Sequence, residues 1–589
     1  DTEYGSFSNY RSFMDNPFAR FSYARVTEAI RRQGAVPVAE LSHSGLYANK
    51  WKNPPGIAYG PVETENCGRQ ILAMDEEMIA RTISKFAGAA AFAKECGFGM
   101  VMIHAGHGWL LHQFLSPQLN TRKDKWGGAD IENRSRLTVE VCKAVRKAVG
   151  PSFPVEIRIS GSECYEGGYG IDEGVAYSKQ FDGLVDLIHV SAGHHEVEEV
   201  YTITHPSLFL PDGANVHLAA EIRKHVNTPV ATVGALADPE LMEEIIADGR
   251  ADVVELARGL FADPDLPGKA RAGEKENIRP CMRCLACFSA LVDKGEFYCA
   301  VNPENGREME LRADIPGARP KKVIVAGGGI AGMQAALTCA QRGHDVTLYE
   351  KEARLGGTLL CEENVPFKKL LSNYIHYQER QVRAAGVYVR LSEKLTPEKA
   401  QEAEADVIIA SLGARPFKPP IPGIDNANVM SAEYAYVNPD TVGERPVILG
   451  AGLVGIELAI YLSMLGRKVT VIEMLPAINH GGNHMHARSL PVQIKKHDIR
   501  IHLNTKASEI GTEGVHCVDL TQPEGAGAQL IPADTVIYAV GQKSLTEEAL
   551  KFNGSAPEFY QIGDCLSPKS IIAATSAAFE AARNIGRNS

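Results

Sequence analysis

The stretch RPCMRCLACFSALVDKGEFYCAVNP, residues 279 to 303, separates two different patterns of sequence in this chain. Cys281, Cys284 and Cys287 follow a CxxCxxC spacing, and Cys299 comes after eleven intervening residues. Zinc ribbons tend to pair two CxxC knuckles about fifteen to twenty residues apart, whereas here three cysteines stand together and one stands alone. The spacing therefore favours a [4Fe–4S] cluster over zinc, because the four thiolates of a cluster need not form two knuckles.

Before this stretch, from about residue 20 to residue 270, short apolar runs alternate with amphipathic helical stretches. This alternation is typical of βα units and a parallel sheet. We predict six strands, at residues 36–41, 100–105, 155–160, 187–191, 230–233 and 253–257, and a helix at 76–96. A closed barrel of such units takes eight strands, and residues 1–18 are too short for two more units. We therefore expect an α/β fold with an N-terminal (β/α)8 barrel whose first two strands are missing from this sequence, rather than an open sheet.

After the cysteine stretch, a unit of strand, glycine-rich turn, helix and strand occurs twice, at residues 321–351 and 445–474. In each copy a GxGxxG motif is followed by a glutamate 23 positions after its first glycine. The residues are Gly327, Gly329, Gly332 and Glu350 in the first copy and Gly450, Gly452, Gly455 and Glu473 in the second. Such glycines let the backbone approach a pyrophosphate, and the acid accepts from ribose hydroxyls. The repeat predicts two nested Rossmann-like dinucleotide-binding domains.

The composition is that of a globular protein of several domains, with 589 residues and a formal net charge of -11. No basic block stands out, which argues against a nucleic-acid partner. The sequence has no apolar run long enough to cross a bilayer and no signal-like leader, so we expect no membrane partner and a cytoplasmic location. Eight of the 12 cysteines lie outside the cysteine stretch, scattered singly, as expected of thiols in a reducing compartment.

The stretch IHAGHGWLLHQFLSPQLNTRKDKWGG at 103–128, followed by ENRSR at 132–136, resembles the flavin barrel of the Old Yellow Enzyme family. The whole chain resembles the multidomain branch of that family, the NADH:flavin oxidoreductases related to 2,4-dienoyl-CoA reductase, 2-enoate reductase and trimethylamine dehydrogenase. This resemblance implies FMN in the barrel. Two further signatures, at 406–416 and 560–565, imply FAD in the first dinucleotide fold. We expect the FMN-binding barrel at 1–275, the iron–sulfur segment and linker at 276–320, the FAD domain at 321–435 and 542–589, and the NAD(H) domain at 436–541.

The resemblance places FMN contacts at the carboxyl ends of the barrel strands, where side chains of several strands converge. Glu40 stands where relatives usually carry Gln and would bond the pyrimidine edge of the flavin. Arg158 would lie beside the N1/O2 edge and stabilise the anionic reduced ring. The remaining expected contacts are Thr2 near the flavin, Gly234, Arg258 and Gly259 at the FMN phosphate, and Asp564 at the ribityl or pyrophosphate of FAD.

His104 and His107 match the pair that the family uses to bind the carbonyl or carboxylate oxygen of the substrate. Trp109 departs from the family, because relatives usually have Tyr there as the proton donor to the α-carbon, and an indole N–H is not acidic. We therefore expect the proton to come from His195, with His194 or a bound water as alternatives. A further alternative is that this chain is a family member that takes the proton from solvent, or one that does not reduce an alkene at all.

Together these residues predict an NADH-dependent ene-reductase of an anaerobe, acting on a small unsaturated carbonyl compound. Electrons would pass from NADH to FAD, then singly through the cluster to FMN, and to the C=C bond as hydride. Glu473 favours NADH over NADPH, because a carboxylate repels the 2′-phosphate. The substrate stays open among enoyl-CoA thioesters, free enoates and cyclic enones, and the paired histidines favour a free enone or enoate. The alternatives are an amine dehydrogenase that runs electrons outward and a diaphorase without a dedicated organic substrate. The oligomeric state, monomer or homo-oligomer, is open.

Overall fold

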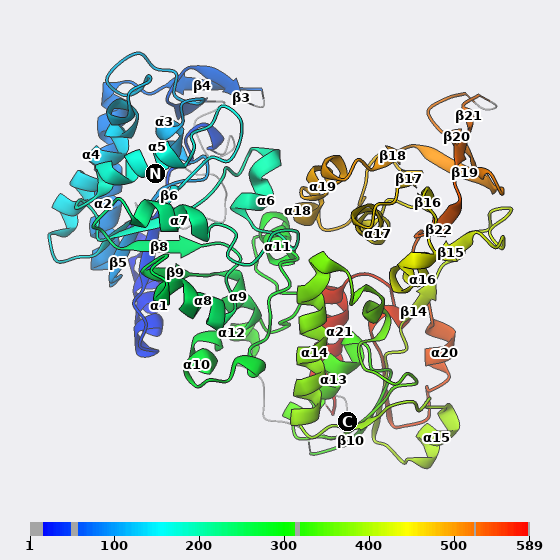
Figure 1. Ribbon diagram of the computed structural model, residues 1–589. Coiled ribbons are helices and arrows are strands. Elements are labelled where there is room, and N and C mark those ends of the chain that lie inside the picture. Colours follow the sequence, from blue (N-terminus) through cyan, green and yellow to red (C-terminus); the bar gives the residue numbers. More distant parts are fainter. Residues whose placement is uncertain are drawn as a thin grey trace. The chain divides into compact units, whose positions relative to one another are not determined.

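The computed structural model describes residues 14, 16–48, 57–66, 68–311, 319–523 and 526–586. The chain divides into two compact units, Asp1–Leu256 and Ala257–Ser589 (Figure 1). Thr2, which we predicted near the flavin, lies outside the described residues.

The first unit is built on one six-stranded parallel sheet, in which the strands neighbour one another in chain order. Its strands are β1 (Val38–Leu41), β5 (Met100–Ala105), β6 (Val155–Ser160), β7 (Leu187–Ser191), β8 (Val230–Val233) and β9 (Val253–Glu255). The longer helices between them are α2 (Glu76–Glu95), α4 (Ile131–Val149), α5 (Ile171–Phe181), α7 (Val216–Arg223) and α8 (Pro239–Ala247). The six predicted strands are confirmed, although β1 begins two residues later and β9 ends two residues earlier than expected. That two further strands complete the barrel stays a prediction.

Helix α2 shows why these segments form as predicted. Asp75 caps its first turn by accepting a hydrogen bond from the Met78 N–H, and Glu76 and Glu77 follow at the positive end of the helix dipole. Its buried residues recur at three- and four-residue spacing, at Ile79, Thr82, Phe86, Ala90 and Ala93. This single apolar face packs against α4 and the sheet.

The two faces of the barrel sheet have opposite character, because side chains alternate along a strand. One face carries apolar residues that join the core under the helices, such as Val101, Ile157 and Val190. The intervening positions carry polar and charged residues: Glu40, His104, Glu156, Arg158, His189 and Ser191. A parallel sheet of this kind would otherwise fill its interior with branched apolar side chains. The polar face is therefore reserved for binding or chemistry.

The second unit contains two parallel sheets, each the centre of a dinucleotide fold. The first has the order β12-β11-β10-β13-β24, from β10 (Lys322–Ala326), β11 (Asp345–Tyr349), β12 (Tyr388–Arg390), β13 (Val407–Ala410) and β24 (Glu558–Gln561). Helix α13 (Ile330–Gln341) packs against α14 (Lys369–Ala384) and against α21 (Ile571–Asn584), which comes from the end of the chain (Figure 1). The first fold is thus interrupted and then resumed, as predicted.

The second sheet is formed entirely by the inserted segment. Its order is β15-β22-β16-β17-β18, from β15 (Val429–Ser431), β16 (Pro446–Leu449), β17 (Thr470–Ile472), β18 (Arg500–His502) and β22 (Thr535–Tyr538). Because β15 pairs with β22, this fold begins a few residues before the expected boundary at 436. An antiparallel pair, β14 (Ala414–Pro416) with β23 (Gln542–Ser544), joins the outgoing and returning strands.

The cysteine stretch belongs to the second compact unit, Ala257–Ser589, and the domain boundary near 275 stays a prediction. Met282, Ala300 and Val301 are buried in the same apolar core as Val323 and Ala335 of the first dinucleotide fold. The segment is therefore anchored on that fold by hydrophobic packing.

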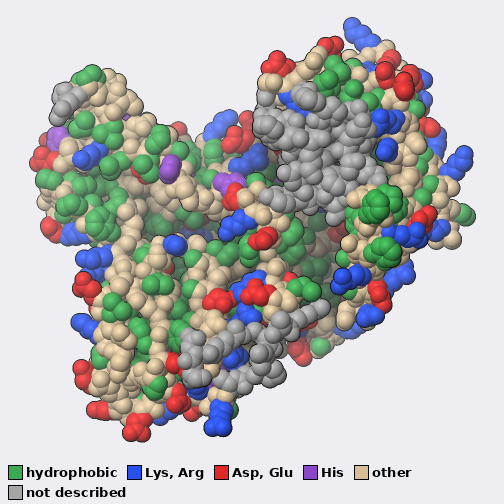
Figure 2. Space-filling view, turned by 180° about the vertical axis from the view of Figure 1, so that it is seen from behind, with side chains coloured by type: hydrophobic (Ala, Val, Ile, Leu, Met, Phe, Trp, Pro, Cys, Tyr) green, Lys and Arg blue, Asp and Glu red, His purple; other side chains and the backbone are tan. Residues whose placement is uncertain are grey.

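None of the helices in the described part of the chain is long and apolar enough to span a membrane. On the face drawn in Figure 2, acidic and basic side chains are interspersed rather than gathered into a patch of one sign.

Candidate functional site

The structure brings four of the predicted barrel residues together at the carboxyl ends of the strands. Glu40 Oε1 lies 2.8 Å from His104 Nδ1, and His104 Nε2 lies 2.9 Å from His107 Nδ1. The chain continues from His107 Nε2 to Ser191 Oγ at 2.7 Å. Arg158 Nη1 is 3.5 Å from the same Glu40 oxygen. A carboxylate, two imidazoles and a hydroxyl thus form one connected set across β1, β5 and β7.

The charges in this set are defined by their neighbours. Partial burial of the Glu40 carboxylate opposes its ionisation, but His104 and then Arg158 outweigh this and hold the pKa of Glu40 well below its usual range. Burial, together with the positive charges of Arg158 and His104, holds the pKa of His107 well below its usual range. Glu40 is therefore an anion and His107 a neutral ring.

Arg158 has a feature that suits a bound flavin. Its Nε is buried and has no hydrogen-bond partner among the described residues. A buried donor without a partner costs about 1 to 3 kcal/mol, and the N1/O2 edge of a flavin would supply the acceptor. This observation fits the predicted role of Arg158 toward FMN.

Trp109 and His195 lie beside this set. The Trp109 ring centroid is 5.2 Å from that of His195 and 6.4 Å from that of His104, and the His107 and His195 rings are 5.1 Å apart. His195 Nδ1 is 2.9 Å from His205 Nε2, a contact that no sequence motif indicated. Burial, and then the neighbouring His205, hold the pKa of His195 well below its usual range, so this ring is neutral.

His194 occupies a different environment, although it is adjacent in sequence. Its ring lies against those of His112 and Tyr47, and its Nδ1 accepts a hydrogen bond from the Glu196 N–H. Burial, and then the charge of His112, lower the pKa of His194 to about 3. A Cβ on Gly108 would lie 2.3 Å from His194 Nε2, so only glycine fits at this position of the HAGHG motif.

The residues predicted at the FMN phosphate fall in both units. Gly234 follows β8 in the first unit and has a φ of 128°, a conformation that favours glycine. Arg258 and Gly259 begin α9 (Arg258–Ala262) in the second unit. That these three hold the phosphate stays a prediction.

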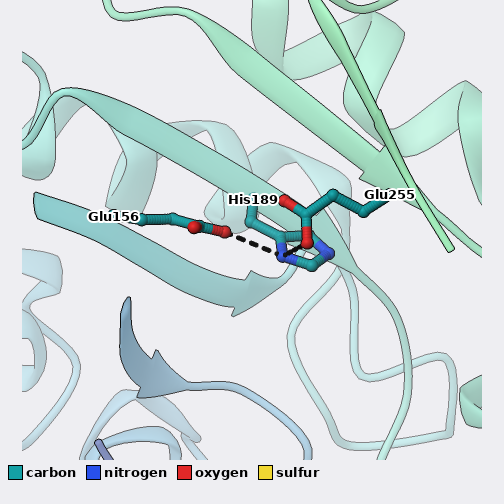
Figure 3. A group of neighbouring side chains, drawn as sticks. All are labelled: Glu156, His189 and Glu255. Atoms are coloured by element: carbon teal, nitrogen blue, oxygen red, sulfur yellow. Dashed lines mark hydrogen bonds and ion pairs between the residues drawn. The ribbon is translucent and has the colours of Figure 1, made fainter. Parts of the chain in front are cut away.

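A second charged group on the polar face of the barrel sheet was missed by the sequence reasoning. His189 Nδ1 lies 3.0 Å from Glu156 Oε1 and 2.9 Å from Glu255 Oε2, so that both carboxylates reach one ring nitrogen (Figure 3). The three ligand atoms lie within 4.8 Å of one another, as around a metal ion, but the His189 distances are those of hydrogen bonds. Burial raises the pKa of Glu156, so this carboxyl shares a proton with its neighbours. In the sequence, only the alternation of apolar and polar residues along β6 could have indicated this charged group.

In the second unit, the four cysteines Cys281, Cys284, Cys287 and Cys299 line one cavity, together with Arg258 and Phe261. Burial, with neighbouring thiols adding to it, raises the pKa of Cys284 to about 12 and that of Cys287 to about 11. Four thiols that line one cavity could hold a metal cluster, and that this cluster is [4Fe–4S] stays a prediction.

A helix of the second dinucleotide fold holds the cysteine loop. Asn483 Nδ2 donates to the Cys284 carbonyl at 2.7 Å, and the Ser289 hydroxyl donates to Asn483 Oδ1 at 2.5 Å. Asn483 also caps α18 (His484–Ala487) by accepting from the His486 N–H. The sequence offered no signal for this contact, because Asn483 and Cys284 are far apart in the chain.

The two glycine-rich loops have the same internal bonding. Glu350 accepts from the Gly328 N–H at 2.7 Å in the first copy, and Glu473 accepts from the Ala451 N–H at 2.7 Å in the second. In both copies the third glycine is required, since a Cβ on Gly332 would lie 1.8 Å from the Gly327 carbonyl oxygen. The loops therefore have the turn and the close helix packing that dinucleotide sites need.

Asp564 lies after β24, which pairs with β13 on the same sheet as the first glycine loop. Burial raises the pKa of Asp564. Its position fits the predicted contact with the ribityl or pyrophosphate of FAD, which stays a prediction.

Comparison with known proteins agrees with this division. Residues 19–277 match the NADH:flavin oxidoreductase / NADH oxidase family, and residues 321–582 match the pyridine nucleotide-disulphide oxidoreductases. An NADH oxidase of Thermoanaerobacter brockii is 36% identical over 97% of this chain and 88% of its own length. A cinnamate reductase of Clostridium sporogenes is 32% identical over 86% of this chain and 78% of its own length. Among solved structures, a 2-naphthoyl-CoA reductase complex superposes with a TM-score of 0.92 and 27% identity, over 99% of this chain and 90% of its own.

Proposed function

Because this chain belongs to the multidomain branch of the NADH:flavin oxidoreductase family, we propose that it reduces the C=C bond of an α,β-unsaturated carbonyl compound with electrons from NADH. As a member of that family it is an NAD(P)H-dependent flavin oxidoreductase. The observation that carries the proposal is the connected set of Glu40, His104 and His107 at the strand ends, because it places two imidazole rings together where a substrate oxygen would bind.

The cofactors of the proposed reaction are FMN, FAD and a [4Fe–4S] cluster, with NADH as the electron donor. Electrons would run from NADH through FAD and the cluster to FMN and the substrate, and the cluster would convert a two-electron donation into single steps. Arg158 and Glu40 would hold the flavin edge in the barrel, and the four cysteines of residues 281–299 would hold the cluster. The glycine loops at Gly327 and Gly450 would hold FAD and NADH.

The barrel residues orient and polarise the substrate. His104 and His107 would bind its carbonyl or carboxylate oxygen, which withdraws electron density from the β-carbon and makes it electrophilic. Trp109 would form an apolar wall beside them, because its indole is buried against His104 and His195. The relatives' names point to cinnamate and a naphthoyl thioester as the kinds of acceptor to test first.

The test is anaerobic turnover of purified holoenzyme with NADH and a panel of enoates, cyclic enones and enoyl-CoA thioesters. We expect NADH consumption matched by saturated product for at least one class. Cys299→Ser should lose cluster iron and substrate reduction while FAD is still reduced by NADH, whereas Cys517→Ser, which alters a buried cysteine of β20 (Gly514–Asp519), should keep its iron. Full alkene reduction by Cys299→Ser would rule out the proposed electron path.

A second candidate is a diaphorase that oxidises NADH without a dedicated organic substrate, and the similarity to an NADH oxidase favours it. It predicts NADH oxidation with dyes or oxygen and no turnover of any unsaturated carbonyl compound in the panel. The amine dehydrogenase alternative predicts reduction of the flavin by amines and no use of NADH. The same panel, extended by methylated amines, distinguishes all three.

A further inference from the structure

We propose that Glu40 holds His104 as an imidazolium and that this cation, rather than a phenol at position 109, donates the proton to the carbonyl oxygen of the substrate. This inference rests on the proposed function, and it adds a proton source to it. Glu40 would be a positioning residue that acts through His104, and His104 the catalytic acid.

The hydrogen-bond geometry leaves His104 with a partner on each ring nitrogen. Nδ1 faces the Glu40 carboxylate at 2.8 Å, which can only accept, so Nδ1 carries a proton. Nε2 faces His107 Nδ1 at 2.9 Å, so one proton lies between these two nitrogens. On the other side of His107, Nε2 lies 2.7 Å from the Ser191 hydroxyl, which can accept a hydrogen bond as well as donate one. Two proton arrangements satisfy this set. In one, a neutral His104 accepts on Nε2 from His107 Nδ1–H; in the other, His104 carries protons on both nitrogens and His107 carries one, on Nε2.

The charges around the ring decide where the extra proton resides. Burial lowers the pKa of His107 and of His195, so the proton does not settle on either of these rings. Arg158 from β6 opposes a second cation but is itself 3.5 Å from Glu40, farther than the contact of Glu40 with His104. Among the described residues, His189 from β7 and His205 after it also act electrostatically on this set. The Glu40 carboxylate is in direct contact with His104 and so is a stabilising anion for it.

The proposed step balances in atoms and charge. A carbonyl oxygen that enters between the two rings takes the His104 Nε2–H hydrogen bond in place of His107. As hydride adds to the β-carbon, the C=C π pair shifts to form the enol C=C and the carbonyl π pair moves to oxygen. The His104 N–H bond breaks and an O–H bond forms, which leaves neutral His104 still bonded to Glu40. The enol then takes a proton at the α-carbon from water and releases its O–H proton, giving the saturated carbonyl compound.

This arrangement accounts for two departures from the family at once. An enol formed by proton transfer to oxygen does not need an acidic group beside the α-carbon, which is consistent with Trp109 in place of Tyr. An anion at position 40 can hold an imidazolium, whereas the Gln of relatives is neutral and cannot. Glu40→Gln therefore separates the two roles of this residue, because an amide can still bond the flavin edge.

The charge of His104 can be measured without any substrate. In holoenzyme labelled with ¹⁵N-histidine, and with the His104 signals assigned by their absence in His104→Asn, we expect both ring nitrogens to show imidazolium shifts at pH 7. Glu40→Gln should show a neutral His104 at the same pH, with its titration moved down by about one to two pH units, the usual effect of a carboxylate at this distance. Glu28→Gln, which alters an exposed ion pair on α1 (Arg20–Arg32), should match the wild type. A neutral His104 in the wild type at pH 7 would overturn the proposal.

The acid role is tested by the pH dependence of kcat/KM with the best acceptor of the panel. We expect the rate to fall on the alkaline side, and Glu40→Gln to begin this fall about one to two pH units lower while retaining a full complement of FMN. An unchanged alkaline limb in Glu40→Gln would overturn the acid role. If the wild type reduces no unsaturated carbonyl compound, the proposed function fails and the acid role with it, and the NMR titration still decides separately whether Glu40 charges His104.

Discussion

At the scale of single residues, the candidate site depends on a few positions where an added side-chain atom would displace a neighbouring residue. Gly108 is the clearest of them, because the His194 ring fills the space of its missing side chain and its φ is 89°. His107, which lies directly between Gly106 and Gly108 in the same turn, also has a positive φ, of 59°. Such backbone is held by its surroundings and clusters at functional sites. The HAGHG motif therefore sets a particular backbone conformation in addition to supplying two imidazole rings.

Gly108→Ala should destabilise the first unit and displace the His194 ring. We expect a loss of about 2 to 4 kcal/mol in the free energy of unfolding, from backbone strain and the clash together. The measurement is chemical denaturation followed by tryptophan fluorescence. Gly34→Ala is the matched control, since Gly34 has a φ of 81° but nothing within 4 Å of a new Cβ. Equal losses in the two variants would contradict the packing role of Gly108.

Glu473 should decide the choice between NADH and NADPH. Its carboxylate accepts from the Ala451 and Leu475 N–H groups, and so stands at the glycine loop where the adenosine ribose would lie. We expect Glu473→Ser to lower the rate of FAD reduction by NADH about tenfold. The ratio of the NADH rate to the NADPH rate should also fall, because the repulsion between the carboxylate and the 2′-phosphate of NADPH is removed. Stopped-flow absorbance with each nucleotide measures this, and Glu444→Ser, an exposed acid before β16, is the control. A wild-type enzyme that prefers NADPH would contradict the assignment.

At the scale of elements, the second unit is held together by side chains that link segments distant in sequence. Lys368 is buried between Glu362 of the first dinucleotide fold, at 2.6 Å, and Glu457 on α17 (Leu453–Met464) of the second, at 2.5 Å. Glu457 also contacts His486 on α18, the helix whose cap residue holds the cysteine loop. One connected path of polar contacts therefore runs from both glycine-rich folds to the candidate cluster.

Asn483→Ala should weaken the hold on the cysteine loop without altering any cysteine. The substitution removes the donor to the Cys284 carbonyl, the partner of Ser289 and the cap of α18. We expect a loss of about 1 kcal/mol in stability from the cap alone. Iron should leave severalfold faster in the presence of a ferrous chelator, followed by absorbance, while Asn553→Ala, at an exposed position, should release iron at the wild-type rate. Unchanged iron loss would show that the loop needs no support from α18.

At the scale of the whole molecule, two residues on the polar face of the barrel sheet make the free energy of unfolding depend on pH in opposite directions. Glu40 has a lowered pKa, so its ion pairs contribute stability above the ordinary glutamate range, and that contribution is lost as the pH falls. Glu156 has a raised pKa because it is buried, and then because Glu255 adds to the effect. Its native form keeps a proton that the unfolded chain releases, so its contribution is present at low pH and is lost as the pH rises through the raised pKa.

Glu156→Gln should remove the second of these effects. Because glutamine cannot ionise, the variant should lose less stability than the wild type as the pH rises from the ordinary glutamate range, about 4.5. We therefore expect the difference in unfolding free energy, variant minus wild type, to increase with pH. Denaturation at a series of pH values measures it, with Glu65→Gln, an exposed residue of β3 (Thr64–Asn66), as the control. Parallel stability curves would contradict the shared proton at His189.

The sequence by itself determined the architecture of this protein and most of its candidate site. Strand periodicity and the two GxGxxG units are local patterns, so the six barrel strands and the two dinucleotide folds could be predicted from them. The interruption of the first fold, and the candidate residues Glu40, His104, His107 and Arg158, could be predicted from the resemblance of short stretches to a known family. Only the tertiary structure decided which of these groups touch. Parallel strands set register and alternation between segments far apart in the chain, and this places Glu40 against His104, His189 between two carboxylates, and Asn483 on the cysteine loop.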